Sequence, residues 1–374
     1  MEVVTSLGTP STGGAHETAP LDLGAGDRLV VLAAHPDDET LAAGGLLQRA
    51  VAASAAIRVV YATDGENNPW AQRASEHRFR IGAADRTRFG AARRAETLAA
   101  LNRLGVPSEC AHFLAFPDQG LTDLLTSHAA LACEALAPHL AGWRPTVVAG
   151  PTAADLHPDH SALAVLARLV LAAASPGVRP RELACLVHNP ALRHHAAATC
   201  SLALTAAERD RKRAAIVCHV SQLHLRGPWL RSFGADSETF LAVPWPAGAP
   251  HPVSAPHENG DQLVIAFDTH PRARSFGART LVLIVESAGP IAALGIPLPC
   301  FSGATDILPL SSGVTTERAS FVGGPWGGEL RLPANLFARA RRVWVKLERR
   351  FGFFDEAGWL EISIPPTQAI GDRR

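Results

Sequence analysis

The stretch Leu29-Val-Val-Leu-Ala-Ala34, followed directly by His35-Pro-Asp-Asp-Glu39, decides the fold. Its first six residues form a short apolar run, which is typical of a strand buried on both faces of a parallel sheet. A segment with helical spacing of its apolar residues comes next, at 40–53, and a second apolar run follows at 57–63. A strand, a helix and another strand in this order predict a βαβ unit with parallel strands.

The same alternation of short apolar runs and amphipathic segments continues as far as residue 223. It predicts an α/β fold with a doubly wound, mostly parallel, Rossmann-like sheet. The predicted strands are 29–34, 57–63, 111–115, 146–149 and 182–187, and the predicted helices are 40–53, 93–104, 121–140, 158–174 and 206–223.

A proline-rich stretch from Pro244 to Pro256 interrupts this alternation. Proline at this density is typical of a stiff linker. Beyond it, strand-like runs separated by Gly and Pro turns predict a smaller all-β, sandwich-like domain. We therefore expect the α/β part to fold without the β-rich part. The predicted strands of the β-rich part are 263–267, 280–286, 342–347 and 360–364. The predicted divisions are a flexible N-terminal tail (1–27), the α/β domain (28–245), the linker (246–260) and a β-rich accessory domain (261–374).

Composition excludes several classes of protein. In 374 residues, 35 Lys and Arg balance 35 Asp and Glu, which argues against a bulk electrostatic attraction to nucleic acid or to an anionic membrane. No apolar stretch reaches the roughly 18 residues that a transmembrane segment requires. Six cysteines without C-x-x-C spacing predict free thiols in a reducing cytoplasm. Nothing in the sequence specifies an oligomeric state.

His35, Asp37 and Asp38 come directly after the first predicted strand, at the edge of the sheet where α/β proteins bind ligands. In a tight turn, His35 and Asp38 can point at one metal ion, whereas Asp37 projects differently and can face a metal-bound water. The alternative is that the acidic side chains only cap a helix, whose N-terminus favours negative charge. The histidine at the strand end favours the metal site.

A second turn of the same kind, Asp155-Leu-His-Pro-Asp-His160, follows the strand predicted at 146–149. The alternative is an ordinary surface loop, since the chain contains 16 histidines. However, a His-Pro-Asp turn occurs at the carboxyl ends of two strands of one predicted sheet. We therefore interpret both turns as parts of one site.

Together, His35, Asp38 and His160 offer two imidazoles and one carboxylate. Three such ligands with one position left for water are typical of catalytic zinc. Asp37 would then accept a proton from the water, and His157 would stabilise an oxyanion or protonate the leaving group.

With these motifs the chain resembles the PIG-L/LmbE-like family of zinc-dependent de-N-acetylases. Ala34-His-Pro-Asp-Asp-Glu39 and His157-Pro-Asp-His160 match the two main motifs of that family. The similarity extends over roughly residues 28 to 245 and includes none of the β-rich part. Further similar segments are Thr63-Asp-Gly-Glu66, Arg93-Arg-Ala-Glu96, Leu104-Gly-Val106, Phe113-Leu-Ala-Phe-Pro-Asp118 and His219-Val-Ser-Gln222.

The resemblance implies a hydrolase that holds one zinc ion and removes an acetyl or other N-acyl group from an amino sugar or glycoconjugate. It implies that Arg93 and Asp118 bind sugar hydroxyls. The ligand set that it implies is His35, Asp38 and His160, with Asp37 as general base and His157 assisting the tetrahedral intermediate.

One position departs from the pattern of some family members, which have a tyrosine two residues before the second motif. This chain has Asp155 there, and its only tyrosine is Tyr61. We expect Asp155 to orient a neighbouring imidazole instead.

Two other functions remain open at this stage. A zinc hydratase or lyase is possible on the same scaffold, because metal-activated water can also add to a double bond. A non-catalytic glycan-binding protein is the third possibility, although such a protein needs no base at Asp37.

The arginine-rich stretch 73–94 is either a solvent-exposed face or a basic lid suited to anionic substrates. Trp326, Trp344 and Trp359 are expected in the core of the β-rich domain rather than on a sugar-stacking surface.

Overall fold

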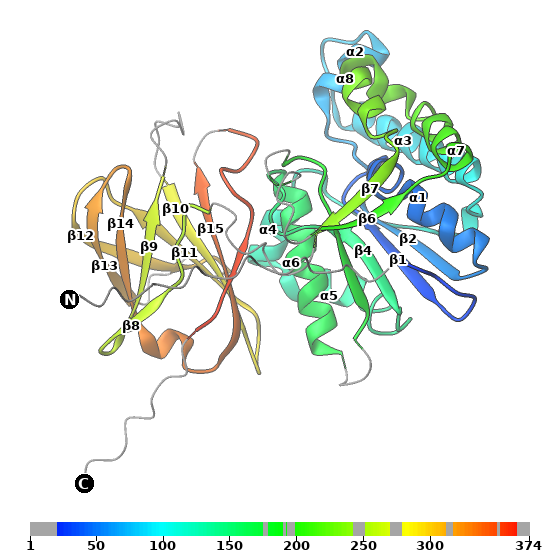
Figure 1. Ribbon diagram of the computed structural model, residues 1–374. Helices are drawn as coiled ribbons and strands as arrows, with labels where there is room; N and C mark the ends of the chain where they lie inside the picture. Colours follow the sequence, from blue (N-terminus) through cyan, green and yellow to red (C-terminus); the bar gives the residue numbers. More distant parts are fainter. Residues whose placement is uncertain are drawn as a thin grey trace, which may run out of the picture.

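The computed structural model describes residues 21–174, 179–189, 192, 199–241, 251–269, 279–311, 317–349 and 352–364. Within these ranges the chain forms an α/β domain and an antiparallel β domain that lie side by side (Figure 1). The predicted tail as far as residue 20, and the predicted linker as far as residue 250, lie outside the described residues.

Among the described residues, seven strands form the sheet of the α/β domain, in the order β3-β2-β1-β4-β5-β7-β6. The first five are parallel, as predicted, but β7 runs antiparallel to β5 and β6, so the sheet is mixed. The sequence did not predict β6 or β7, because each is only five residues long and contains polar residues. The strands are β1 Arg28–Ala33, β2 Ala56–Thr63, β3 Ala111–Phe116, β4 Val147–Pro151, β5 Arg181–Cys185, β6 Thr199–Ala203 and β7 Ser237–Leu241.

Helices cover both faces of this sheet, as a doubly wound fold requires (Figure 1). Alternate residues of β1 enter two apolar cores: Leu29 and Val31 face α1, α3 and α7, whereas Val30 and Leu32 face α4, α5 and α6. The helices are α1 Asp38–Ala52, α2 Pro69–Glu76, α3 Ala83–Leu104, α4 Leu121–Ser127, α5 Ala129–Leu136, α6 Pro158–Ala173, α7 Ala206–Ile216 and α8 Val220–Ser232.

Three helices differ from their predicted bounds. The segment predicted at 121–140 forms two helices, because His128 between them has non-helical dihedral angles (φ −139°, ψ 35°). The segment predicted at 206–223 is likewise divided after Ile216. Helix α3 begins ten residues earlier than predicted, since most of its first turns are exposed and polar and carry no apolar periodicity.

The order of the strands brings the two predicted motifs together. Strands β1 and β4 are neighbours in the sheet. Successive strands are added on one side of β1 as far as β3, and from β4 on they are added on the other side. Doubly wound sheets bind ligands in the crevice at the carboxyl ends of such strands. His35 follows β1 and His157 precedes α6 after β4, so both motifs lie at this crevice.

In the part of the β domain that the structure describes, nine antiparallel strands form one continuous sheet, in the order β16-β15-β10-β11-β12-β13-β14-β9-β8. The two halves of this sheet join between β11 and β12 and enclose a single apolar core. The sequence predicted the strands that correspond to β9, β10, β15 and β16, but not the Gly-containing and Pro-containing strands between them. The strands are β8 His257–Asn259, β9 Gln262–Asp268, β10 Arg279–Ser287, β11 Ala292–Leu298, β12 Gly303–Pro309, β13 Glu317–Gly324, β14 Gly327–Pro333, β15 Ala340–Arg349 and β16 Leu360–Ile362.

The two domains share apolar core. Trp344 and Trp359 of the β domain are completely buried, in the same cluster as Val148 and Leu163 of the α/β domain. They are therefore core residues, as expected, whereas Trp326 is 43% exposed. Part of the apolar surface of the α/β domain is thus covered by the β domain, which argues against the expectation that the α/β part folds alone.

All six cysteines carry free thiols, as the spacing predicts. Among the residues that the structure describes, no helix combines the length and apolarity needed to cross a membrane.

Candidate active site

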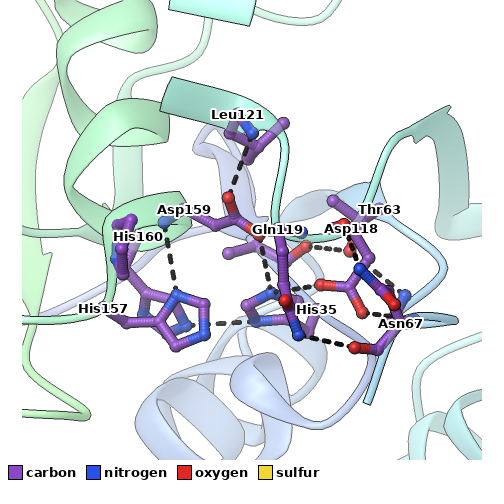
Figure 2. A network of polar contacts seen from close by, with 12 residues as sticks. His35, Thr63, Asn67, Asp118, Gln119, Leu121, His157, Asp159 and His160 are labelled. Atoms are coloured by element: carbon purple, nitrogen blue, oxygen red, sulfur yellow. Dashed lines mark hydrogen bonds and ion pairs between the residues drawn. The ribbon is translucent and has the colours of Figure 1, made fainter. Parts of the chain in front are cut away.

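The three side chains predicted to bind metal, His35, Asp38 and His160, converge beside the ends of β1 and β4. Figure 2 shows two of them, His35 and His160. His160 Nε2 lies 3.2 Å from both His35 Nδ1 and Asp38 Oδ2, and His35 Nδ1 lies 3.5 Å from Asp38 Oδ2. Ligand atoms bound at about 2.0–2.2 Å to a tetrahedral zinc ion lie about 3.3–3.6 Å from one another. The spacing and chemistry of these three atoms therefore fit one zinc ion.

Carboxylates contact the opposite nitrogen of each imidazole. His35 Nε2 lies 3.2 Å from Asp118 Oδ1 and 3.3 Å from Asp159 Oδ2 (Figure 2). His160 Nδ1 lies 3.5 Å from Asp155 Oδ2. Carboxylates in this position orient metal-binding imidazoles and make them more basic. Asp155 thus lies where it can orient an imidazole, and Asp118, expected to bind sugar hydroxyls, contacts His35 as well as the cavity.

Sequence reasoning missed Asp159, although it is part of the second motif. Its side chain is completely buried, and its carboxylate accepts hydrogen bonds from the backbone N–H groups of Gln119 (2.7 Å) and Leu121 (3.0 Å). Asp159 therefore ties the loop after β3 to the start of α6, in addition to its contact with His35.

His188 was also missed. It comes shortly after β5, and its backbone N–H donates to Asp155 Oδ2 at 3.1 Å. Its ring stacks on Trp229 with a centroid distance of 5.3 Å and an interplanar angle of 18°. The signal that would have found it is its position, since a third predicted strand of the same sheet ends there.

Asp37 has a backbone conformation that is rare for a residue other than glycine, with φ 120° and ψ −29°. Conformations of this kind cost about 1–3 kcal/mol and persist where the surroundings fix them. Here Glu39 Oε2 accepts the backbone N–H of Asp37 at 3.2 Å, and Arg93 donates to Pro36 O at 2.5 Å. Asp37 lines the cavity but is not one of the three converging ligand residues.

Arg93 is buried and holds the turn that presents Asp37. Its Nη2 donates to Asp37 Oδ2 at 3.2 Å, and its Nη1 donates to Gly65 O at 2.8 Å. Gly65 has φ 63°, and a Cβ atom there would lie 1.9 Å from Arg93 Nη1, which explains a glycine at this position. Arg93 also borders the cavity, and its contact with a sugar hydroxyl stays a prediction.

The segment His219–Gln222, one of those that resemble the family, contacts α1 next to the first motif and also α3. His219 Nε2 lies 3.2 Å from Thr40 Oγ1, and the Thr40 hydroxyl donates to Glu39 Oε1 at 2.6 Å. Ser221 donates to Glu96 through its backbone N–H (2.8 Å) and its hydroxyl (2.7 Å). These contacts connect α8 to α1 and α3.

Burial and neighbouring charges shift the pKa values of the site residues in opposite directions. Burial raises the pKa of Asp37 to about 7, although the nearby Arg93 guanidinium opposes this shift. Burial would lower the pKa of His160, but the neighbouring carboxylates, Asp38 first, outweigh it and raise that pKa to about 10. Burial also lowers the pKa of His157 well below its ordinary value. Carboxylates that hold protonated imidazoles would equally stabilise a divalent cation.

The site opens into a cavity of about 630 Å³, an ordinary size for a small-molecule site. Its polar side includes Arg93 and Asp118, and its other side is lined by aromatic residues. The remaining arginines of 73–94 do not line this cavity, and those at positions 78 and 88 form exposed ion pairs. These ion pairs favour the solvent-exposed interpretation of that stretch.

A family profile and several known proteins match part of this chain. The sequence profile described as "PIG-L: GlcNAc-PI de-N-acetylase" matches residues 30–171. A Mycobacterium sp. (strain KMS) protein named 1D-myo-inositol 2-acetamido-2-deoxy-alpha-D-glucopyranoside deacetylase is 38% identical over 152 residues, which cover 36% of this chain and 46% of that protein. A protein of the same name from Mycolicibacterium smegmatis (strain ATCC 700084 / mc(2)155) is 33% identical over 168 residues, 40% of this chain and 55% of that protein.

The chain thus spans about half the length of the curated relatives that it matches. Among solved structures, N,N'-diacetylchitobiose deacetylase from Pyrococcus horikoshii shares 20% sequence identity with this chain. The match covers 57% of this chain and 82% of that protein, with a TM-score of 0.44.

Proposed function

We propose that this protein is a zinc-dependent hydrolase of amino sugars, since residues 30–171 match the model of the PIG-L family. It removes an N-acetyl or other N-acyl group from an amino sugar that is either free or part of a glycoconjugate. One observation carries this proposal: the ligand atoms of His35, Asp38 and His160 converge at 3.2–3.5 Å beside a cavity of substrate size.

The zinc ion, when bound by these three residues, would polarise the amide carbonyl and make a water molecule more acidic. Asp37 accepts the proton of the attacking water on its carboxylate and acts as general base. Arg93 keeps that carboxylate in place through its hydrogen bond of 3.2 Å.

His157 supports the tetrahedral intermediate as a hydrogen-bond donor. Its Nδ1 accepts the backbone N–H of Asp159 at 3.2 Å (Figure 2), so the proton of the neutral ring resides on Nε2. Since His157 lines the cavity, this N–H can donate a hydrogen bond to the oxyanion, and the proton that Asp37 took from the water passes to the leaving amine.

Arg93 and Asp118 lie on the polar side of the cavity and bind hydroxyl groups of the sugar in this proposal. Asp118 has a second task, because its contact with His35 fixes the orientation of that imidazole. Asp155 does the same for His160.

The test is release of acetate and free amine from N-acetylglucosamine and its glycosides. We expect the two products in equal amounts, complete loss of release in the presence of a chelator, and recovery when zinc is added back. His160→Ala is the matched inactive control. A wild-type protein that holds one equivalent of zinc and releases no acid from any N-acyl sugar would contradict the proposed function.

A further inference from the structure

The segment that joins β15 to β16 belongs to the β domain but reaches the candidate active site of the α/β domain. Phe353 and Phe354 lie in this segment and line the same cavity as Asp37 and Asp38. The Phe353 ring is 4.8 Å from the His157 ring, centroid to centroid, and nearly perpendicular to it (83°). The cavity is therefore completed by residues outside the part of the chain that resembles a known family.

Backbone contacts fix this segment against the second motif. The backbone N–H of Asp355 donates to Leu156 O at 2.9 Å, directly beside His157, and the backbone N–H of Trp359 donates to Ala153 O at 2.7 Å. The approach is so close that a Cβ atom at Gly358 would lie 1.8 Å from Ala153 O. The segment is therefore a fixed part of the lining of the cavity.

Side chains of the β domain hold the same segment from the other side. Asp355 forms an ion pair with Lys346 on β15 at 2.9 Å, and Lys346 is only 1% exposed. Arg279 on β10 lies 3.4 Å from Glu356. Because the segment is anchored to both domains, the phenyl rings are presented in a fixed position.

The two phenylalanines continue into a larger aromatic surface, which we call the aromatic wall and define as Phe353, Phe354, His188 and Trp229. The Phe354 and His188 rings are 5.7 Å apart, and His188 stacks on Trp229. Phe353 remains 44% exposed although it is held in place. An exposed apolar surface of this kind inside a cavity indicates a binding role, because aromatic faces gain free energy by covering apolar groups.

We propose that the aromatic wall binds an apolar group that the substrate carries next to its N-acyl amino sugar. The β domain thereby determines substrate specificity through Phe353 and Phe354. This inference rests on the proposed function and adds a substrate class to it. The apolar group is either an aglycone on the sugar or an acyl chain longer than acetyl, since each would place apolar surface beside the amide.

Two pairs of substrates test the proposal with the full-length, zinc-loaded protein. The first pair is the phenyl and methyl glycosides of N-acetylglucosamine, and the second is the N-hexanoyl and N-acetyl forms of the methyl glycoside. We expect wild type to prefer the apolar member of at least one pair. The double variant Phe353→Ala/Phe354→Ala should lower that ratio of kcat/KM about 10-fold. The ratio is the readout because a general disturbance of His157 affects both members equally.

A change in the first ratio identifies the apolar group as an aglycone, and a change in the second identifies it as an acyl chain. Unchanged ratios for both pairs overturn the proposal. Phe353→Leu/Phe354→Leu retains apolar volume and should keep most of the preference. Phe301→Ala, an 80% exposed phenylalanine elsewhere in the β domain, is the matched control and should leave both ratios unchanged.

Binding of the product amines separates this inference from the proposed function. By calorimetric titration, wild type should bind phenyl glucosaminide more tightly than methyl glucosaminide, and the alanine double variant should lose that difference if the group is an aglycone. Retention of this pattern without any acid release would sustain the aromatic wall and contradict the hydrolase. Acid release without any preference for an apolar substrate or amine would support the hydrolase and contradict the role of the aromatic wall.

Discussion

The polar side and the aromatic side of the cavity are built in different ways. The proposed metal ligands and catalytic groups on the polar side come from two short turns, 35–39 and 155–160, each of which follows a strand of one sheet. Arg93 on α3 and Asp118 after β3 complete this side. The aromatic side combines α8 and the β5 end with the segment before β16, which is remote in sequence from both turns. The groups proposed to carry the chemistry are thus encoded locally, whereas the shape of the substrate site depends on how the two domains pack.

The two sides meet at the second turn, 155–160. Asp355 donates its backbone N–H to Leu156 O, and the next residue is His157. The β domain therefore contacts the turn that carries a proposed catalytic group. Variants on either side should distinguish loss of metal, loss of chemistry and loss of domain packing.

The largest effect is expected on the polar side, from removal of a metal ligand. His160→Ala deletes one of three converging ligand atoms, so the protein should retain almost no zinc after desalting and should lose its activity. Metal analysis by mass spectrometry measures this directly. His224→Ala, at an exposed position on α8, is the control and should hold one equivalent. Full retention of zinc in His160→Ala would remove His160 from the ligand set.

The next effect separates chemistry from metal binding. Asp37→Asn preserves the shape of the side chain but removes its basicity, so kcat should fall about 10²- to 10⁴-fold while the zinc content and KM stay near wild type. Steady-state kinetics together with metal analysis check both parts. Loss of zinc in this variant would make Asp37 a ligand, and an unchanged kcat would place the base elsewhere.

Sequence reasoning identified the polar side because its signals are short. His35 and Asp38 are three residues apart after a strand, and the second His-Pro-Asp turn follows another strand of the same predicted sheet. That β4 lies next to β1 is a finding of the structure. The same reasoning did not find His188, which is followed by Asn189 and has no carboxylate or second histidine beside it to form a metal-binding motif.

Phe353 and Phe354 could not be found from their own sequence, because phenylalanine in a β domain usually packs in that domain's core. Only the covering of α6 by the β domain brings them to His157. The strands β11 to β14 were missed for a different reason, since Gly and Pro within them weaken the strand signal.

The third effect tests the packing of the domains. Trp359 is completely buried in the core that both domains share, so Trp359→Ala should lower the free energy of unfolding by about 3–5 kcal/mol. Urea unfolding measures this free energy. Trp326→Ala is the control, and its effect should be smaller because Trp326 is 43% exposed. For the same reason, a chain that ends at residue 250 should be less stable than the full chain. A Trp359→Ala protein as stable as the control variant would mean that the domains are energetically independent.

The smallest effect concerns a carboxylate that acts on the metal through an imidazole. Asp155 Oδ2 lies 3.5 Å from His160 Nδ1, and its two oxygens also accept backbone N–H groups of His157, Val187 and His188. Asp155→Asn removes the negative charge but keeps one accepting oxygen, so zinc affinity should fall about 10- to 100-fold.

Asp155→Ala, in contrast, removes the acceptor of the backbone N–H groups of His157 and His188 and should also destabilise the fold, by about 1–3 kcal/mol for each buried group that stays unsatisfied. Competition with a zinc-binding dye gives the affinity, and melting of the chelator-treated proteins gives the stability. Asp123→Asn, at an exposed position on α4, is the matched control and should change neither. If Asp155→Asn binds zinc as tightly as wild type, Asp155 serves only the backbone, and the basicity of His160 does not depend on it.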